Sequence, residues 1–465
     1  MSVANVTTHE ARRFKPYPAY KDSDSEWLGK IPAGWVRAAL ARVTFSRCDG
    51  PFGSGLKSEH YASSGVRVVR LQNIGSAEFK GGDEAFIDEG YAAILGDHSV
   101  RPDDLLVAGL GDEAHPVGRA CVAPDGVQPA MVKADCFRFR LDTRRVVPTF
   151  VAYQLSATAT GTAGSLATGA TRARMNLTTT ASRLLAIPSV DEQHTIVRFL
   201  DRETARIDAL VAKKERLIEL LQEKRTALIT HAVTKGLDPN VPMKASGIEW
   251  LGAIPAHWEV KRVRDIAEAL QTGPFGSQLH ADEYVVGGYP IINPANLGGG
   301  ELRHDPDCTV DERTASRLAH HRLRMGDILF ARRGELGRCG LVTEGQEDWL
   351  CGTGCLRLRP RPAVTDPRFL IRLLSTSGVG EWLALQSVGA TMQNVNTSII
   401  GRIPIVVSPS IAEQRAIAAF LDRETARLDA LVAKVREAIE RLKEFRTALI
   451  SAAVTGKIDV RDAAT

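Results

Sequence analysis

Two long segments of the chain repeat apolar residues at alternating steps of four and three positions. In the first segment these positions run from Ile196 to Leu228, and seven of the ten are apolar. In the second they run from Ile417 to Leu449, and nine of the ten are apolar. This spacing is typical of the buried seam of a heptad helix. It predicts two long helices, over 191–234 and 411–456.

Each predicted helix has a start signal in the residues that precede it. Pro188 ends the preceding segment, Ser189 is a candidate N-cap, and Glu192 stands where a capping box needs its glutamate. Ser410 and Glu413 repeat the pattern before the second helix. About 40 residues of helix would span roughly 60 Å, which is too long to be buried within one small domain.

The other long helix is the obvious packing partner for each of them. Two matching seams in one chain meet at high effective concentration, and a two-fold repeat favours an antiparallel pair. Leu210 and Leu431 stand at equivalent seam positions. The alternative is that each helix packs only on its own domain.

The whole chain is an internal duplication, with a step of 221 residues between the helix segments and 223 between the openings of the bodies. FLDRETARIDALVAK at 199–213 returns as FLDRETARLDALVAK at 420–434, with 14 of 15 positions identical. EWLGKIPAGW at 26–35 returns as EWLGAIPAHW at 249–258, PFGSGL as PFGSQL, and RTALI at 225–229 as RTALI at 446–450. The predicted organisation is a tail (1–25), a first body (26–190), a long helix (191–234), a linker (235–248), a second body (249–410), a second long helix (411–456) and a tail (457–465).

Each body mixes short apolar strands with glycine-rich turns. VRVVRL at 66–71 and GDILFA at 326–331 are examples, and the coarse prediction is an α/β or α+β body. Each body opens with two tryptophans, Trp27 and Trp35 in the first and Trp250 and Trp258 in the second. Tryptophan is usually buried, so we interpret them as core anchors in preference to base-stacking platforms.

Composition limits the possible functions without choosing one. The 44% hydrophobic content is ordinary for a packed protein, and 59 basic against 55 acidic residues give a net charge of only +4. Any affinity for DNA must therefore come from local patches. The first 20 residues lack the apolar core of a secretory signal and no run of 18 apolar residues occurs, so we expect a cytoplasmic protein without a membrane span.

The seven cysteines are scattered and odd in number, which favours reduced thiols over a disulfide framework. Cys351 and Cys355 with His320 and His321 could be drawn as a zinc site. The two-residue spacing typical of zinc ligands is missing, however, and the first body has only Cys136 at the corresponding place. We therefore expect no metal.

Polar side chains suited to DNA gather in the predicted loops. Arginine, asparagine and glutamine make paired hydrogen bonds to guanine or adenine edges, and lysine and serine bind phosphates. The candidates for DNA contact are Ser54, Lys57, Arg70, Gln72, Asn73, Arg119, Arg172 and Arg174 in the first body and Ser277, Gln278, Asn293, Asn296, Arg332, Arg333, Gln393 and Asn394 in the second.

These candidates fall into three kinds. The asparagines shared by both copies, Asn73, Asn296, Asn176 and Asn396, could equally brace turns through side-chain to backbone bonds. The unshared residues Arg172, Arg174, Gln393 and Asn394 are better candidates for base contact. Arg119, Arg332 and Arg333 resemble phosphate clamps.

Charged residues of the long helices are reproduced without change in the two copies. A solvated face would not impose identity on two copies of one sequence, whereas a surface that binds the same partner twice would. The candidate docking residues are Asp201, Arg202, Glu203 and Arg206 with Asp422, Arg423, Glu424 and Arg427.

The sequence offers no reaction centre. Residues 112–115 spell Asp-Glu-Ala-His, as in a helicase, but no phosphate-binding string GxxxxGK[ST] accompanies them. A dinucleotide-type GxGxxG after a strand and the Asn-Pro-Pro-Tyr or Asp-Pro-Pro-Tyr string of amino-methyltransferases are also absent. No catalytic residue is therefore assigned.

The chain resembles the specificity subunit of a type I restriction-modification system. Five motifs that occur twice in the same order carry the resemblance: the EWLGxIPxxW opening, the PFGS loop, the GAT…N loop, the PSxxEQ entry and the duplicated helix. The resemblance implies two target-recognition domains, each reading half of a split sequence in double-stranded DNA. An antiparallel helix pair would hold them apart and dock two modification (methyltransferase) subunits, with restriction subunits joining the core. S-adenosylmethionine, ATP and magnesium would belong to those partners, and this chain would be non-catalytic.

One stretch departs from strict repetition, because the first body has RARMN where the second has MQNVN. Two other classes of function stay open from the residues alone. One is a self-contained DNA methyltransferase or nuclease with an unrecognised site, and the other is a coiled-coil scaffold that does not bind DNA.

Overall fold

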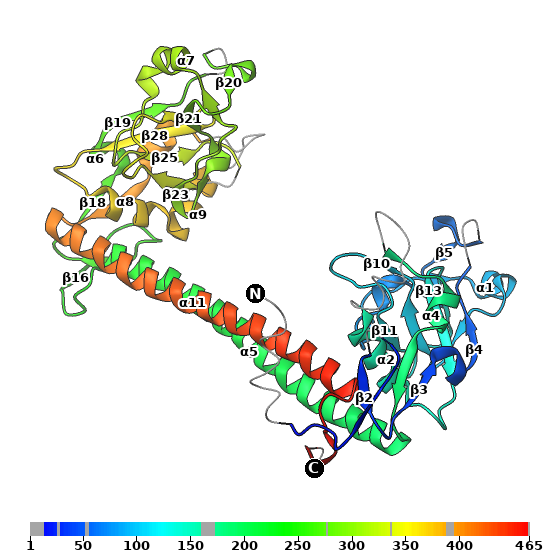
Figure 1. Cartoon of the computed structure of the whole chain (residues 1–465). Coiled ribbons are helices and arrows are strands. Elements are labelled where there is room, and N and C mark those ends of the chain that lie inside the picture. The colour runs from blue at the N-terminus through cyan, green and yellow to red at the C-terminus, as the bar shows by residue number, and fades with distance from the viewer. Residues whose placement is uncertain are drawn as a thin grey trace. The chain divides into compact units, whose positions relative to one another are not determined.

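The computed structural model describes residues 14–25, 28–51, 55–159, 173–275, 278–334, 337–386 and 395–463, which fall into two compact units. The first unit comprises Met1–Lys214 and Glu437–Thr465, and the second comprises Glu215–Arg436. The predicted long helices are confirmed as α5 (Val190–Lys235) and α11 (Ile411–Val454). Each unit therefore holds one body and one half of each long helix (Figure 1).

The first body, residues 14–189, contains two main sheets. One has the strand order β11-β9-β13-β4 and the other the order β5-β7-β6-β12-β8. Only the β12–β6 pair among these described strands is parallel. The strands of the first body are β1 (Tyr20–Asp22), β2 (Lys30–Pro32), β3 (Val36–Ala39), β4 (Thr44–Cys48), β5 (Tyr61–Ala62), β6 (Val66–Val69), β7 (Phe86–Ile87), β8 (Ser99–Val100), β9 (Leu105–Ala108), β10 (Leu110–Gly111), β11 (Ala120–Val122), β12 (Ala130–Val132), β13 (Cys136–Leu141), β14 (Ala173–Arg174) and β15 (Leu184–Ile187). Its helices include α1 (Glu89–Leu95), α2 (Pro148–Ala157) and α4 (Leu177–Ala181).

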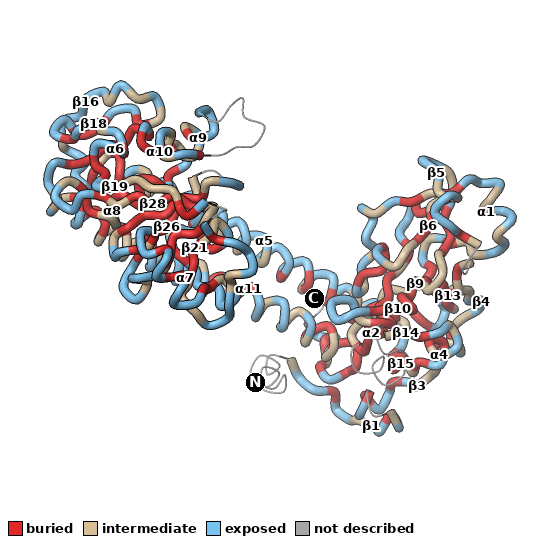
Figure 2. Tube along the Cα trace, turned by 90° about the horizontal axis from the view of Figure 1, so that it is seen from above, coloured by how far each residue is buried: buried red, intermediate tan, exposed pale blue. Residues whose placement is uncertain are grey.

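The second body, residues 236–410, repeats this plan with the orders β19-β28-β25-β26-β23-β22 and β20-β24-β21-β27. The β21–β27 pair is parallel, like its counterpart β6–β12. The strands of the second body are β16 (Met243–Ala245), β17 (Ala253–Pro255), β18 (Glu259–Arg262), β19 (Ala267–Thr272), β20 (Tyr284–Val285), β21 (Tyr289–Ile292), β22 (Leu297–Gly298), β23 (Gly300–Leu302), β24 (Thr309–Val310), β25 (Ile328–Ala331), β26 (Cys339–Leu341), β27 (Leu350–Cys351), β28 (Cys355–Pro360) and β29 (Pro404–Val407). Its helices include α6 (Val263–Ile266), α7 (Glu312–Arg317), α8 (Pro367–Leu374), α9 (Ser377–Gln386) and α10 (Thr397–Arg402). The α/β character predicted for both bodies is confirmed, and the buried residues concentrate in their sheets (Figure 2).

One tryptophan in each body anchors the body to the start of a long helix. Trp35 and Trp258 are buried, and their indole N–H groups donate to Glu192 and Glu413, respectively, at 3.1 Å in both copies. The expectation of core anchors is confirmed for these two residues. Trp250 is half-buried against the second core, and Trp27 lies outside the described residues.

The helix starts differ from the prediction in one respect. The hydroxyls of Ser189 and Ser410 accept the N–H groups of Glu192 and Glu413 at 3.3 Å, so the predicted N-caps are confirmed. The glutamate carboxylates do not turn back to the caps as a capping box requires. They accept the indole N–H groups, because a buried indole needs an acceptor more than an exposed cap does.

Within each unit α5 and α11 are antiparallel neighbours joined by an ion pair. In the first unit Asp208 pairs with Arg446 at 3.0 Å, and in the second Asp429 pairs with Arg225 at 3.1 Å. A step of 221 residues converts each aspartate and each arginine into its counterpart. The predicted antiparallel pairing is therefore confirmed in both units.

The predicted seam is wrong at Leu210 and Leu431. Leu210 and Leu431 are 40% and 43% exposed, whereas Leu200 and Leu421, three turns earlier in each helix, are fully buried. The buried ends of the helices pack into the body cores, which supply apolar neighbours from several elements. A two-helix contact alone covers less of each helix, so Leu210 and Leu431 stay partly in water.

Candidate nucleic-acid interface

Three loop segments of the first body meet at one point that we call the loop junction, defined by Gly109, Asp135 and Met175. The N–H of Gly109 donates to the carbonyl of Asp135 at 2.7 Å, and the N–H of Met175 donates to the carbonyl of Gly109 at 2.9 Å. These segments follow β9, precede β13 and follow β14, respectively. The junction thus brings together Gly109 and Met175, which are more than 60 residues apart in the sequence.

Arg174 projects from this junction and is held by Asp135. Its Nε and Nη2 atoms lie 3.1 and 2.8 Å from the same Asp135 Oδ1 atom. The Arg174 side chain is 52% exposed, whereas the Asp135 side chain is only 17% exposed. Arg174 was predicted as a base contact, and the structure places it at the surface with part of its guanidinium open to solvent.

Asp49 supports the junction from the end of β4. Its Oδ1 atom accepts the N–H of Asp135 at 3.0 Å and that of Gly50 at 2.7 Å. Burial raises the pKa of Asp49 to about 6, and the nearby Asp135 charge adds to the rise, against the opposing effects of the two N–H donors and Arg174. Neither Asp49 nor Asp135 was identified from the sequence.

The second body forms the same junction with different residues. The N–H of Arg332 donates to the carbonyl of Gly354 at 2.8 Å, and the N–H of Val395 donates to the carbonyl of Arg332 at 3.0 Å. Arg332 thus stands where the first body has Gly109, and Gly354 where it has Asp135. Arg332 is half-buried, and its neighbour Arg333 is exposed.

Other candidates for DNA contact lie on exposed loops without a fixed role. Lys57 is exposed beside Glu59, at 3.6 Å, and Gln72 is exposed on the loop after β6. Gln278 is exposed, but its Oε1 atom accepts the N–H of Phe275 at 2.9 Å. Five candidates lie outside the described residues, namely Ser54, Arg172, Ser277, Gln393 and Asn394.

The shared asparagines brace the backbone, as the alternative interpretation expected. Asn73 is fully buried, and its Nδ2 atom donates to the carbonyls of Lys80 and Asp83 at 2.9 and 2.8 Å. Asn296 accepts the N–H of Asn293 at 2.9 Å.

Asn176 and Asn396 cap α4 and α10, respectively. All four asparagines are thus engaged with their own main chain, and the prediction of DNA contact is corrected for Asn73 and Asn296.

Asn293 and Arg70 occupy equivalent positions at the starts of these turns. Asn293 donates to the hydroxyl of Tyr284 at 3.3 Å, and Arg70 forms an ion pair with Asp83, with Nε and Oδ2 3.0 Å apart. Both side chains are partly buried, so their main role in the structure is to fasten a turn.

Arg119 corrects the prediction of a phosphate clamp. Its guanidinium donates to main-chain carbonyls of Ile74 at 2.7 Å, Leu71 at 3.0 Å and Leu110 at 3.1 Å, and the residue is only 5% exposed. Burial lowers its pKa. A phosphate could not reach this group without displacing those carbonyls, so Arg119 holds the loops together.

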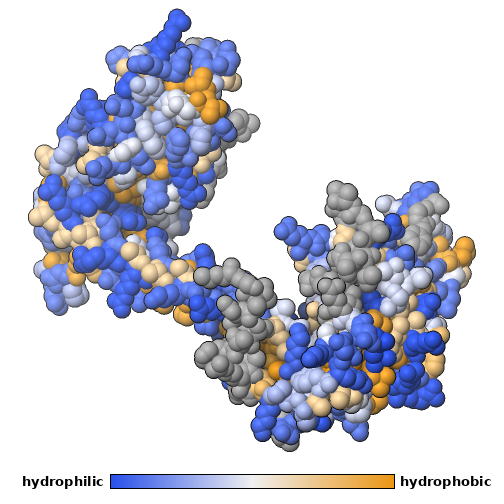
Figure 3. All heavy atoms as spheres, in the orientation of Figure 1, coloured by the Kyte–Doolittle hydropathy of each residue, from blue (hydrophilic) through white to orange (hydrophobic). Residues whose placement is uncertain are grey.

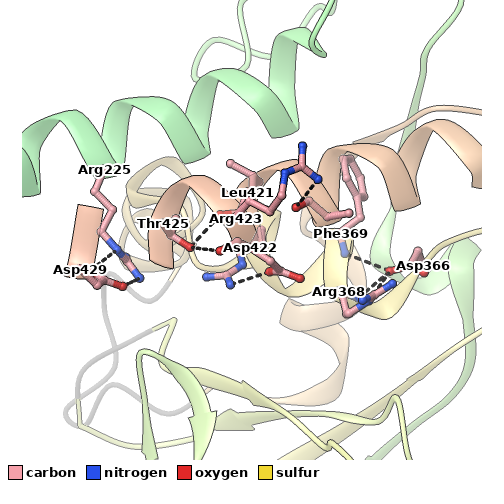
Figure 4. Close-up of polar contacts among 11 residues, drawn as sticks. Arg225, Asp366, Arg368, Phe369, Leu421, Asp422, Arg423, Thr425 and Asp429 are labelled. Atoms are coloured by element: carbon pink, nitrogen blue, oxygen red, sulfur yellow. Dashed lines mark hydrogen bonds and ion pairs between the residues drawn. The ribbon is translucent and has the colours of Figure 1, made fainter. Parts of the chain in front are cut away.

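Two of the predicted docking residues join the long helices to their own bodies. The carboxylate of Asp201 accepts the hydroxyl of Tyr153 at 2.8 Å. Asp422, which is labelled in Figure 4, accepts Arg372 of α8 at 3.0 Å. Identity of these aspartates between the copies is therefore explained by the repeated contact between helix and body. The Arg225–Asp429 pair lies further along the same helices in Figure 4.

The other predicted docking residues lie on the helix surface. Arg202 lies 3.2 Å from Glu203, and Arg206 lies 4.0 Å from the same carboxylate. Arg423 and Arg427 are exposed and Glu424 is half-exposed.

Neither a helicase box nor a zinc site is formed by the residues considered for them. Asp112 accepts the N–H groups of Ala114 and His115 at 3.0 and 2.8 Å, so residues 112–115 form a surface turn. Cys351 and Cys355 are buried, and burial raises the pKa of Cys351 to about 12. Among the described residues no group of three or more His, Cys, Asp or Glu side chains could hold a metal ion.

The comparisons with known proteins agree with this architecture. Residues 255–441 match the family model of the Type I restriction modification DNA specificity domain. The chain is 23% identical to the EcoBI specificity subunit of Escherichia coli, covering 93% of this chain and 88% of that protein. It is 22% identical to the EcoKI specificity subunit of Escherichia coli K12, covering 92% and 90%.

Solved structures share the fold at lower identity. A chain of a type I restriction-modification system matches with a TM-score of 0.62 and 17% identity, over 91% of this chain and 98% of that one. The HsdS subunit of Thermoanaerobacter tengcongensis matches with a TM-score of 0.52 and 17% identity, over 92% and 98%. Over nine tenths of its length the chain is thus similar to specificity subunits of type I restriction enzymes, and part of it matches the specificity-domain family. In the part of the chain that is described, no helix is long and apolar enough to cross a membrane.

Proposed function

We propose that this chain gives a type I restriction-modification complex its DNA sequence specificity, with each body reading one half of a split target. The observation that carries the proposal is the loop junction. Its hydrogen bonds are the same in both bodies, while Gly109 and Asp135 of the first are replaced by Arg332 and Gly354 of the second. A constant backbone with different exposed side chains is what two readers of different sequences require.

The long helices are the proposed docking site for two modification subunits, with restriction subunits joining through the same core. The support is a set of exposed side chains that recur after 221 residues, Arg202 with Arg423 and Arg206 with Arg427. Leu210 and Leu431 add apolar area to this face. Hydrophilic residues make up most of the molecular face that Figure 3 shows. S-adenosylmethionine, ATP and magnesium are assigned to the partner subunits, and this chain is proposed to be non-catalytic.

Exchange of the first body tests the two-reader proposal. Residues 26–188 are replaced by the corresponding body of a related specificity subunit, the chain is assembled with its modification subunits, and methylated sites are mapped. One half of the recognised sequence should change while the other half is retained. A simultaneous change in both halves would contradict the proposal.

Two further measurements separate the alternative classes. A self-contained methyltransferase would bind labelled S-adenosylmethionine as the purified chain alone. A scaffold that does not bind DNA would show no salt-dependent affinity for duplex DNA.

A further inference from the structure

The loop junction of the first body leaves one edge of the Arg174 guanidinium available. A guanidinium carries five N–H donors in one plane. Asp135 takes one from Nε and one from Nη2. The two donors of Nη1 and the second donor of Nη2 remain, and a neighbouring pair of them forms the fork that binds guanine O6 and N7 in the major groove.

Asp135 is itself fixed, so it can fix Arg174. Its backbone has φ +64°, its N–H donates to Asp49 at 3.0 Å, and its carbonyl accepts the N–H of Gly109 at 2.7 Å. A carboxylate held in this way limits the rotation of Arg174 before any ligand arrives, which lowers the entropy lost on binding. An unheld arginine at a surface would lose most of its rotamer freedom when it met a base.

The second body lacks this device in the same backbone position. Gly354 replaces Asp135, so no side chain is present there to hold an arginine. Gly352 stands where the first body has Lys133, since each donates its N–H to the parallel strand beside it, at 2.9 Å in both copies. The difference between the bodies therefore lies in the side chains and leaves the main chain unchanged.

We propose that Arg174 reads a guanine in the half-site recognised by the first body, and that Asp135 is the residue that positions it. The inference rests on the proposed function and extends it by naming the base and its reader. The second body then reads the corresponding position without an arginine held by an aspartate.

The test uses the full chain assembled with its modification subunits and a library of randomised DNA duplexes. Bound or methylated duplexes are sequenced for the wild type, Arg174→Ala, Arg174→Lys and Asp135→Gly. Glycine is chosen at 135 because it suits the positive φ and is the residue of the second body. The half-site of the second body is an internal control for folding and assembly.

Arg174→Ala should reduce the preference for guanine at one position by about 5- to 150-fold, which is the discrimination of a good bidentate contact. Arg174→Lys should lose part of this preference while keeping the charge. Asp135→Gly should weaken the preference at the same position by a smaller factor, since Arg174 remains. The slope of log affinity against log salt should be retained in Arg174→Ala, because no phosphate contact is lost.

Two outcomes would overturn the inference. In one, Arg174→Ala keeps the guanine preference but lowers the salt slope by about one unit, which would place Arg174 on a phosphate. In the other, the first half-site contains no guanine that depends on Arg174. Failure of the proposed function would look different, because the wild-type complex itself would then yield no two-part motif.

Discussion

Arg119 provides a direct test of the distinction between a loop fastener and a phosphate clamp. Replacing Arg119 with methionine keeps the aliphatic stem and removes the guanidinium. The carbonyls of Ile74, Leu71 and Leu110 then lose donors at 2.7, 3.0 and 3.1 Å. Each buried carbonyl left without a donor costs about 1–3 kcal/mol.

The net loss is smaller than the sum of these costs. Burial lowers the pKa of Arg119, so removing its charge recovers part of the desolvation penalty. We expect Arg119→Met to lower the free energy of unfolding of the first unit by about 3 kcal/mol. Urea denaturation gives the overall change, and hydrogen–deuterium exchange of peptides covering 71–80 and 108–120 locates it.

Arg174→Met is the matched control, because it removes the same group from an exposed ion pair. Such pairs contribute about 0–1 kcal/mol, so its stability should stay close to that of the wild type. The reasoning would be refuted if Arg119→Met kept the wild-type stability and exchange pattern while the salt slope of DNA binding fell by about one unit. That result would mean that a phosphate reaches the guanidinium after all.

Three more predictions concern the helices and the junction. Leu210→Asp with Leu431→Asp should change the free energy of unfolding by less than about 1 kcal/mol, because both side chains are partly exposed, whereas Leu200→Asp should unfold the first unit; equal urea midpoints for the two variants would contradict this. Asp49→Asn keeps the Oδ1 acceptor and removes a carboxyl group whose pKa is raised to about 6. The variant should therefore have a higher melting temperature than the wild type above pH 6, and this advantage should disappear toward pH 4. An advantage that does not change with pH would show that the ionisation of Asp49 beside Asp135 and Arg174 is not its cause. A chain that stops at residue 436 should show fast hydrogen exchange throughout the first body but not the second, and protection of the first body in that truncated chain would be the contrary result.

The large-scale architecture could be predicted because it depends on patterns that repeat. The 221-residue step, the serine caps and the apolar spacing of the helices each follow from local sequence, and the tryptophan anchors follow from their size. The extent of the helix seam could not be predicted. Heptad spacing is the same at Leu200 and Leu210, but only the first has a body packed over it.

Roles of single arginines were the hardest to predict. Arg70, Arg119 and Arg174 are all loop arginines in sequence, yet they form a turn fastening, a buried link between carbonyls and an exposed side chain beside Asp135. The role of each arginine depends on partner residues that are 13 to 48 positions away in the sequence. No local sequence pattern predicts these partners. Only one feature of the sequence could have pointed to Asp135, the aspartate that holds Arg174. The second copy has a glycine, Gly354, in its place.

The repeat in the sequence is not the repeat in space. One sequence copy consists of a body followed by its long helix, but the first unit takes the end of α11 from the second copy, and the second takes the end of α5 from the first. Val454 and Val460 are fully buried in the first core, as Val233 is in the second. Because each unit needs apolar residues from both copies, the long helices are part of the fold of each body as well as a connection between them. A substitution near the end of one helix therefore acts on the body of the other copy, and the effect of a helix variant on DNA reading has to be assigned by unit and not by position in the sequence.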